Sequence, residues 1–379
     1  MQRLTRLFLL LASAGGLFAQ YPGLTLPTSG NNQKAVVTQF IGPVRVSIEY
    51  SSPAVHGPNG KDRRGQIWGK LVPYGMSQPD SFGNGKPFPW RAGANENTVF
   101  TVSDEVQIEG KPLPPGRYGL HMIPGPEEWT VIFSKDASSW GSFFYDPADD
   151  ALRVTVKPHK TEYREWLTYD FTERRPAQAT VELQWEDLAV PVGIKVDHIE
   201  DVYVTRLRRE LTSVPAFTYQ GYLAAAQYCA QNNTHLEDGL KWADAAISAP
   251  FIGETNFNTL STKALLLARM GRQDDALQLM RTAVRHPTAT PLQIHQYARQ
   301  LLAQKKTPEA VEVFKYNAEK NGDAWPVHVG LMRAYAATGE NEKALEHARK
   351  ALGQAPDELN RKNLEDVIQR LSSGQGIDQ

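Results

Sequence analysis

The residue types best suited to bind a ligand lie in one short run, from Trp90 to Glu96. The guanidinium of Arg91 can hold a carboxylate or phosphate through two parallel hydrogen bonds, and the indole of Trp90 can stack on a sugar or aromatic ring. Asn95 and Glu96 add an amide and a carboxylate. We predict a ligand site here. The alternative is a structural corner, with Arg91 paired with Glu96, Asn95 in a left-handed turn, and Trp90 closing the domain.

A histidine and a second carboxylate extend this candidate site. His121 lies in an alternating run, and with Glu49 and Glu96 it can form a cluster able to bind a ligand or move a proton. The alternative is a histidine that is simply hydrogen-bonded. His-x-His and His-Glu-x-x-His spacings are missing, so we predict no metal and no cofactor. His56, in a basic loop, is interpreted as a solvated residue.

Motifs of nucleophilic catalysis are missing from the sequence. It contains neither Gly-x-Ser-x-Gly nor Ser-x-x-Lys, and its single cysteine, Cys229, falls in a helical region. We therefore favour binding over catalysis. Two alternatives stay open. One is an extracytoplasmic hydrolase that uses Glu96, His121 and Arg91 as catalytic candidates, and the other is an envelope structural protein without a small ligand.

Period-two alternation dominates the first half of the chain and must position these residues. Val44, Val46 and Ile48 share one face of such a run, while Arg45 and Ser47 share the other. Similar runs recur up to residue 185, separated by proline- and glycine-rich turns. Strands with one apolar face each bury those faces by packing as two sheets. The sequence predicts an antiparallel β-sandwich.

The second half of the chain has helical periodicity and an internal repeat. Ala276, Ala310 and Ala344 follow one another at 34 residues, and each opens the second helix of a hairpin. This spacing predicts tetratricopeptide-like repeats, whose concave groove usually holds a peptide or a partner protein. The alternatives are that the groove packs against the β-domain of the same chain or stabilises a dimer. The expected fold is α+β and multidomain, with a β-sandwich followed by a helical solenoid.

Several motifs of the first half resemble a bacterial family, domain-of-unknown-function family 2911, over residues 35 to about 190. They are Ile41 to Val44, Gly69 to Gly75, Trp90 to Thr98, Gly116 to Leu120 and Glu128 to Phe133. The resemblance implies an exported β-rich domain, sometimes followed by helical repeats, and it implies no activity. The chain departs from shorter members by a Gly/Pro-rich insertion over residues 77–89.

The first twenty residues have the layout of a secretory signal, with basic residues, an apolar stretch and small residues near Ala19. Cleavage there would leave a periplasmic or secreted protein without a membrane span. The net charge of −1 gives no reason to expect nucleic acid as a partner. A protein or peptide is expected in the repeats, and a small molecule or glycan on the β-domain. The predicted segments are a signal peptide (1–19), a flexible leader (20–34), the β-sandwich (35–190), a linker helix (191–214), helical repeats (215–372) and a disordered tail (373–379).

Overall fold

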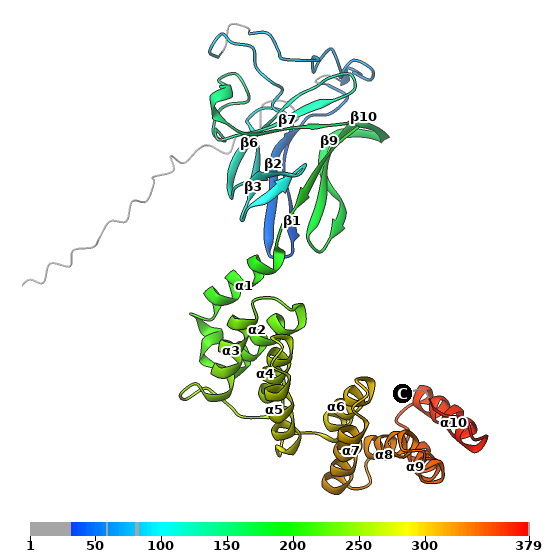
Figure 1. The fold of residues 1–379 in the computed structure, drawn as a ribbon. Coiled ribbons are helices and arrows are strands. Elements are labelled where there is room, and N and C mark those ends of the chain that lie inside the picture. The colour runs from blue at the N-terminus through cyan, green and yellow to red at the C-terminus, as the bar shows by residue number, and fades with distance from the viewer. Residues whose placement is uncertain (1–31, 58–59, 80–82, 378–379) are drawn as a thin grey trace, which may run out of the picture. The chain divides into compact units, whose positions relative to one another are not determined.

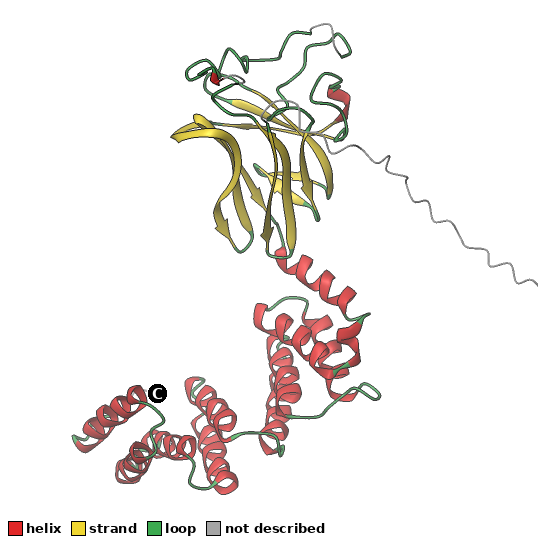
Figure 2. Ribbon diagram, turned by 180° about the vertical axis from the view of Figure 1, so that it is seen from behind, coloured by secondary structure: helices red, strands yellow, loops and turns green. Residues whose placement is uncertain are grey.

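The computed structural model describes residues 32–57, 60–79 and 83–377. The predicted signal peptide and nearly all of the predicted leader lie outside these residues. The chain divides into two compact units, residues 1–199 and 200–379. The first is built from strands and the second from α-helices (Figure 1; Figure 2). No helix in the described part of the chain has the length and hydropathy needed to cross a bilayer.

The larger sheet of the first unit has six antiparallel strands in the order β1-β2-β3-β6-β7-β8. Alternation explains why they form: Val44, Val46 and Ile48 are buried, and the residues between them turn to the other face. The strands are β1 (Gln33–Ile41), β2 (Val44–Ser52), β3 (Thr98–Val102), β6 (Gly116–Ile123), β7 (Trp129–Ser134) and β8 (Asp150–Val156).

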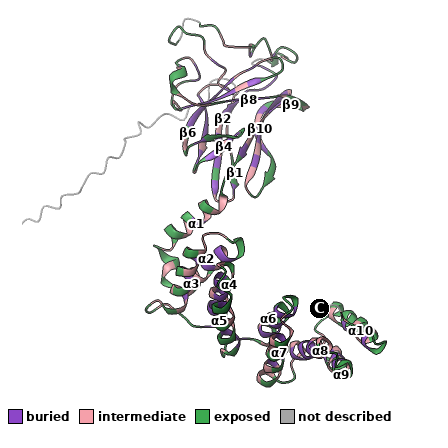
Figure 3. Cartoon of the chain, viewed as in Figure 1, coloured by how far each residue is buried: buried purple, intermediate pink, exposed green. Residues whose placement is uncertain are grey.

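The smaller sheet has four strands in the order β5-β4-β10-β9. They are β4 (Val106–Ile108), β5 (Lys111–Leu113), β9 (His159–Arg175) and β10 (Gln178–Lys195). Buried side chains of the two sheets meet face to face, with Ile48 and Leu120 on one side and Leu183 on the other. Buried segments are found on the strands of both sheets (Figure 3). The predicted β-sandwich is confirmed.

Strand β10 runs past the point at which the sequence predicts a linker helix. The prediction places that helix over 191–214, but the helix observed there, α1, spans Ile199–Glu210. Val192 and Ile194 are buried and continue the period-two pattern, so burial keeps the chain extended. Pro191 is tolerated because it follows the last residue paired with β9 and precedes the first paired with β4.

The second unit is a stack of helical hairpins, as the 34-residue spacing predicts. Ala276, Ala310 and Ala344 each occupy the fourth position of the second helix of a hairpin and are buried. Small side chains at these crossings let the paired helices approach. The helices are α2 (Tyr219–Asn232), α3 (Leu236–Ser248), α4 (Phe257–Arg269), α5 (Gln273–Arg285), α6 (Pro291–Ala303), α7 (Thr307–Asn321), α8 (Trp325–Ala337), α9 (Asn341–Gly353) and the closing α10 (Glu358–Ser372).

Candidate functional site

Trp90 joins a cluster of four tryptophans at one end of the sandwich. Its backbone N–H and C=O exchange two 2.8 Å hydrogen bonds with Met122 of β6. Its indole is nearly parallel to that of Trp185, with ring centroids 6.4 Å apart, and it meets Trp68 and Trp129 edge to face. Trp129 and Trp185 are buried, whereas Trp90 stays half-buried. Trp90 therefore both closes the sandwich and presents part of its ring to solvent.

Arg91 extends from the same loop towards the segment between β7 and β8. Its Nη1 donates to the backbone oxygen of Asn95, and its guanidinium lies over the ring of Phe143, 4.8 Å from the centroid. Burial lowers the pKa of Arg91. Asn95 has a φ of 57°, the left-handed conformation that its short amide side chain tolerates. Arg91 thus packs within the domain and is not paired with Glu96.

Glu49 and Glu96 lie at the β1–β2 side of the larger sheet. Glu96 accepts a 3.0 Å hydrogen bond from the hydroxyl of Ser51, and Glu49 forms a 2.7 Å ion pair with Lys34. Both carboxylates contribute to a raised pKa of Lys34, for which the hydrogen bond to Glu49 is the largest cause.

His121 belongs to a different network. It is buried on β6, its Nδ1 lies 2.7 Å from the Oγ of Ser142, and its ring meets that of Tyr145 edge to face. Burial lowers the pKa of His121 to about 4. Glu49 lies on β2, which β3 separates from β6 by a spacing of about 10 Å. Glu96 precedes β3, the direct neighbour of β6, but it accepts its hydrogen bond from Ser51 of β2. The structure brings Arg91 near His121, but it does not place Glu96 and Glu49 in that network.

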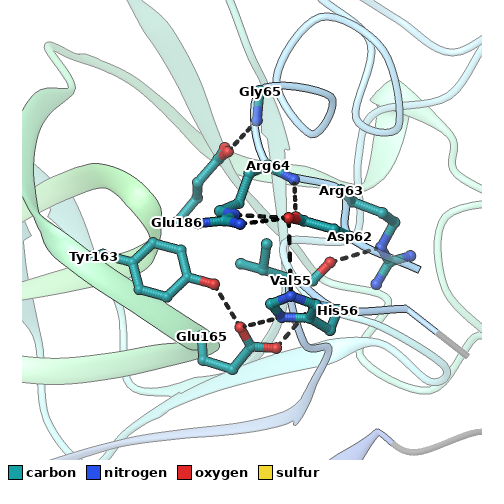
Figure 4. Close-up of polar contacts among 9 residues, drawn as sticks. All are labelled: Val55, His56, Asp62, Arg63, Arg64, Gly65, Tyr163, Glu165 and Glu186. Carbon is teal, nitrogen blue, oxygen red and sulfur yellow. Dashed lines mark hydrogen bonds and ion pairs between the residues drawn. The ribbon is translucent and has the colours of Figure 1, made fainter. Parts of the chain in front are cut away.

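A polar network that sequence reasoning overlooked surrounds His56 (Figure 4). Glu165 of β9 accepts from the backbone N–H of His56 at 2.8 Å, and its other oxygen lies 2.9 Å from the ring Nδ1. Tyr163 donates its hydroxyl hydrogen to the same carboxylate. On the far side of the ring, Nε2 lies 4.0 Å from Asp62, which Arg64 holds with both Nε and Nη2. The hydrogen bond from Arg64 lowers the pKa of Asp62 to about 2.

A cleft of about 290 Å³ lies between the tryptophan cluster and this network. Trp90 and Trp185 line it together with His56 and Arg63, and Asn32 and small or apolar residues complete the wall. The buried indole N–H of Trp185 has no acceptor among the residues that the structure describes. The cleft thus combines an aromatic wall with donors, the composition typical of a site for a small polar ligand.

Within the described ranges, no group of three or more His, Cys, Asp or Glu side chains is arranged to hold a metal ion.

A second concave site, of about 350 Å³, lies in the helical unit between α2, α4, α5 and α6. Apolar residues such as Leu265, Met280 and Tyr297 line it, and glutamines surround them. On α6, Gln296, Gln300 and the following Gln304 are spaced by four residues and are exposed. We call this site the glutamine groove. Its glutamines are Gln227, Gln231, Gln273, Gln293, Gln296, Gln300 and Gln304.

Comparison with known proteins shows that the first unit is similar to one protein family. Residues 32–194 match the family described as "Protein of unknown function (DUF2911)". We refer to the sandwich as the DUF2911 domain because of this match. The resemblance inferred from the motif at Trp90 to Thr98 is thereby confirmed. No curated protein matches the chain.

Three solved structures are similar to the chain at low sequence identity. MamA AMB-1 is 14% identical with a TM-score of 0.28, over 41% of this chain and 85% of that one. YrrB, titled a TPR protein with an unusual peptide-binding site, is 18% identical with a TM-score of 0.30, over 44% and 86%. A tetratricopeptide repeat protein from Parabacteroides merdae ATCC 43184 is 14% identical with a TM-score of 0.32, over 45% and 68%.

The cleft of the DUF2911 domain includes one predicted residue, Trp90, together with His56, which the sequence analysis interprets as solvated, and Arg63 of the same basic loop. The partner of His56 is Glu165, 109 residues further along the chain. Tyr163 and Glu165 alternate on β9, which indicates a shared polar face, but no local spacing connects that face with His56. The signal for this site exists only in the folded domain.

Proposed function

We propose that this protein is an exported binding protein. Its helical repeats hold an extended peptide, or a flexible segment of a partner protein, in the glutamine groove. Its DUF2911 domain holds a small molecule or glycan in the tryptophan-lined cleft. Export is supported by the basic, apolar and small-residue segments that precede Gln20. The observation that carries the proposal is the row of glutamine amides beside apolar side chains.

The spacing of that row suits an extended backbone. Gln296, Gln300 and Gln304 follow one another by four residues, a rise of about 6 Å along a helix. Alternate residues of an extended peptide lie about 6.7 Å apart. Each glutamine amide both donates and accepts, so it can pair with the C=O and N–H of a peptide unit whatever its side chain. Such a row would select an extended conformation more than a particular sequence.

Apolar contact would supply most of the affinity. Leu265, which lines the groove, is 42% exposed, and Met280 and Tyr297 lie in the same site. Covering an exposed leucine contributes about 1–2 kcal/mol. Each glutamine amide gives up hydrogen bonds to water when it bonds to a peptide group, so each contributes only about 1 kcal/mol or less to the binding free energy. A bound segment should therefore carry apolar side chains on the face that meets α4 and α5.

Selected peptides test this proposal. Peptides would be isolated from a random library displayed on phage, synthesised, and titrated calorimetrically against the full chain. Leu265→Glu should weaken binding at least tenfold, because it places a charge among the apolar residues of the groove. Leu359→Glu is the matched control: Leu359 is 70% exposed and lies on α10 outside the groove lining. Equal effects of the two substitutions would refute groove binding.

The small-ligand role of the DUF2911 domain rests on a separate observation, the half-buried face of Trp90 beside Trp185 in the cleft. Trp90→Ala should abolish binding of any ligand that uses this wall, measured by quenching of tryptophan fluorescence. The hydrolase alternative receives no such support. It requires Glu96 and His121 at one substrate, and these two side chains belong to separate hydrogen-bond networks.

A further inference from the structure

Arg63 is held in a fixed position at the wall of the cleft. Its Nε donates to the backbone oxygen of Val55 at 3.1 Å, and its Nη2 donates to that of Ala54 at 2.6 Å. The guanidinium lies against Gly57, where a Cβ would come within 3.0 Å of Nε and 3.1 Å of Cζ. Two hydrogen bonds and this close contact orient the group before any ligand arrives. Its Nη1 makes no hydrogen bond to the described residues.

Arg63 also differs from the neighbouring charged residues in its ion pairing. Arg64, next in sequence, is paired with Asp62 at 2.7 Å, and Glu165 is engaged by His56 and Tyr163. Within the described part of the chain, no carboxylate lies within ion-pair distance of Arg63. A half-buried guanidinium has lost part of its hydration, and an anionic oxygen from a ligand would restore that interaction.

The rest of the cleft is suited to a ring. Trp90 and Trp185 stand nearly parallel at an interplanar angle of 14°, and Leu71 and Val72 line the same space. An indole face packs well on the C–H face of a sugar and on an aromatic ring. At about 290 Å³ the cleft falls at the small end of ligand sites, which suits one ring and its substituents.

We propose that the cleft binds a small ring-bearing carboxylate, with the carboxylate on the guanidinium of Arg63 and the ring against the half-buried Trp90, which the buried Trp185 backs. This inference rests on the proposed small-ligand role of the DUF2911 domain and adds the chemical class of the ligand. A uronic acid and an aromatic acid share this chemistry. The probes must therefore separate the two sources.

Paired probes that differ only in charge provide the test. D-Glucuronate would be compared with D-glucose, and phenylacetate with 2-phenylethanol, by calorimetric titration of the full chain at low and high salt. At least one acid should bind ten times more tightly than its neutral partner, and added salt should reduce the difference. Preference for glucuronate indicates an acidic sugar, and preference for phenylacetate indicates an aromatic acid. This comparison uses the unmodified protein, so it does not depend on a variant that folds.

Substitutions then locate the charge. Arg63→Gln should remove the tenfold preference for the acid, and Gly57→Ala should reduce it by displacing the guanidinium while keeping its charge. Lys61→Gln is the matched control, because it removes one positive charge from the same loop without a side chain in the cleft lining. It should leave the preference intact.

Two outcomes would overturn the inference in distinguishable ways. If neutral and acidic rings bind equally, Arg63→Gln has no effect, and Trp90→Ala abolishes binding, then the cleft binds rings and the assigned ligand class is wrong. If none of the four probes binds to the folded protein, both the assigned ligand class and the small-ligand role of the domain are wrong.

Discussion

The Nδ1 of His121 and the Oγ of Ser142 lie 2.7 Å apart and connect strand β6 to the segment between β7 and β8. His121 is 2% exposed. Burial is the main reason that its pKa falls to about 4, with Arg91 adding to the effect and Asp136 opposing it. The ring is therefore neutral in the folded domain at pH values at which an unfolded histidine takes up a proton.

This relationship predicts an acid-sensitive domain. The folded pKa of about 4 lies below the ordinary histidine value of 6.5, so the contribution of His121 to stability is fully present above pH 6.5 and is lost as pH falls towards 4. Between pH 7 and 5 the loss should be about 2 kcal/mol. Urea unfolding followed by tryptophan fluorescence measures it in the wild type and in His121→Gln, whose stability should vary less with pH by that amount. Parallel pH profiles would contradict the assignment.

Gly141 makes room for Arg91 and should not accept a side chain. Its φ is 62°, and a Cβ there would lie 2.3 Å from Cζ of Arg91. Gly141→Ala should lower the free energy of unfolding by about 1–2 kcal/mol, because alanine is strained in the left-handed backbone conformation. Displacement of the Arg91 guanidinium should lower it further. Gly110→Ala is the control, since Gly110 has a φ of 75° with nothing within 4 Å of its Cβ position. If both variants unfold at the same urea concentration, the packing of Arg91 is not tight.

Gly330 makes the corresponding close contact in the helical unit. A Cβ at this position of α8 would come within 2.6 Å of the Phe314 ring on α7. Gly330→Ala should destabilise the repeats by about 1–3 kcal/mol through overpacking. Gly353→Ala, in α9, has open space around it and should be neutral or stabilising by up to about 1 kcal/mol. Far-UV circular dichroism during thermal unfolding distinguishes the two, and equal stability would show that α7 and α8 separate easily.

The fold was largely predictable because its signals are local and repeated. Alternation at Val44, Val46 and Ile48 predicts a strand with one buried face, and the 34-residue spacing predicts the hairpins. The predicted end of the β-domain at residue 190 is too early, because β10 continues through Pro191 to Lys195. Whether the strand continues depends on the neighbours of β10, which the sequence does not reveal.

The candidate site was less predictable, since its partners are distant in sequence. Trp90 was identified from its residue type, and it does line the cleft. Arg91 is predicted on the same grounds of residue type and position in the loop, yet its guanidinium packs over the ring of Phe143 inside the domain. Arg63 lies in a basic loop whose composition indicates only solvation. What distinguishes Arg63 from Arg64 is that Asp62 pairs with one and not the other, a choice made by the folded loop.

Peptide binding in the glutamine groove is tested most directly by photo-cross-linking on α6. A benzophenone amino acid would replace Gln300 within the groove or Leu359 of α10 outside it, and each protein would be irradiated with a library-selected peptide. Efficient cross-linking from position 300, with little from position 359, is the expected result. Cross-linking that is equal at both positions, or stronger from 359, would contradict a peptide-binding groove.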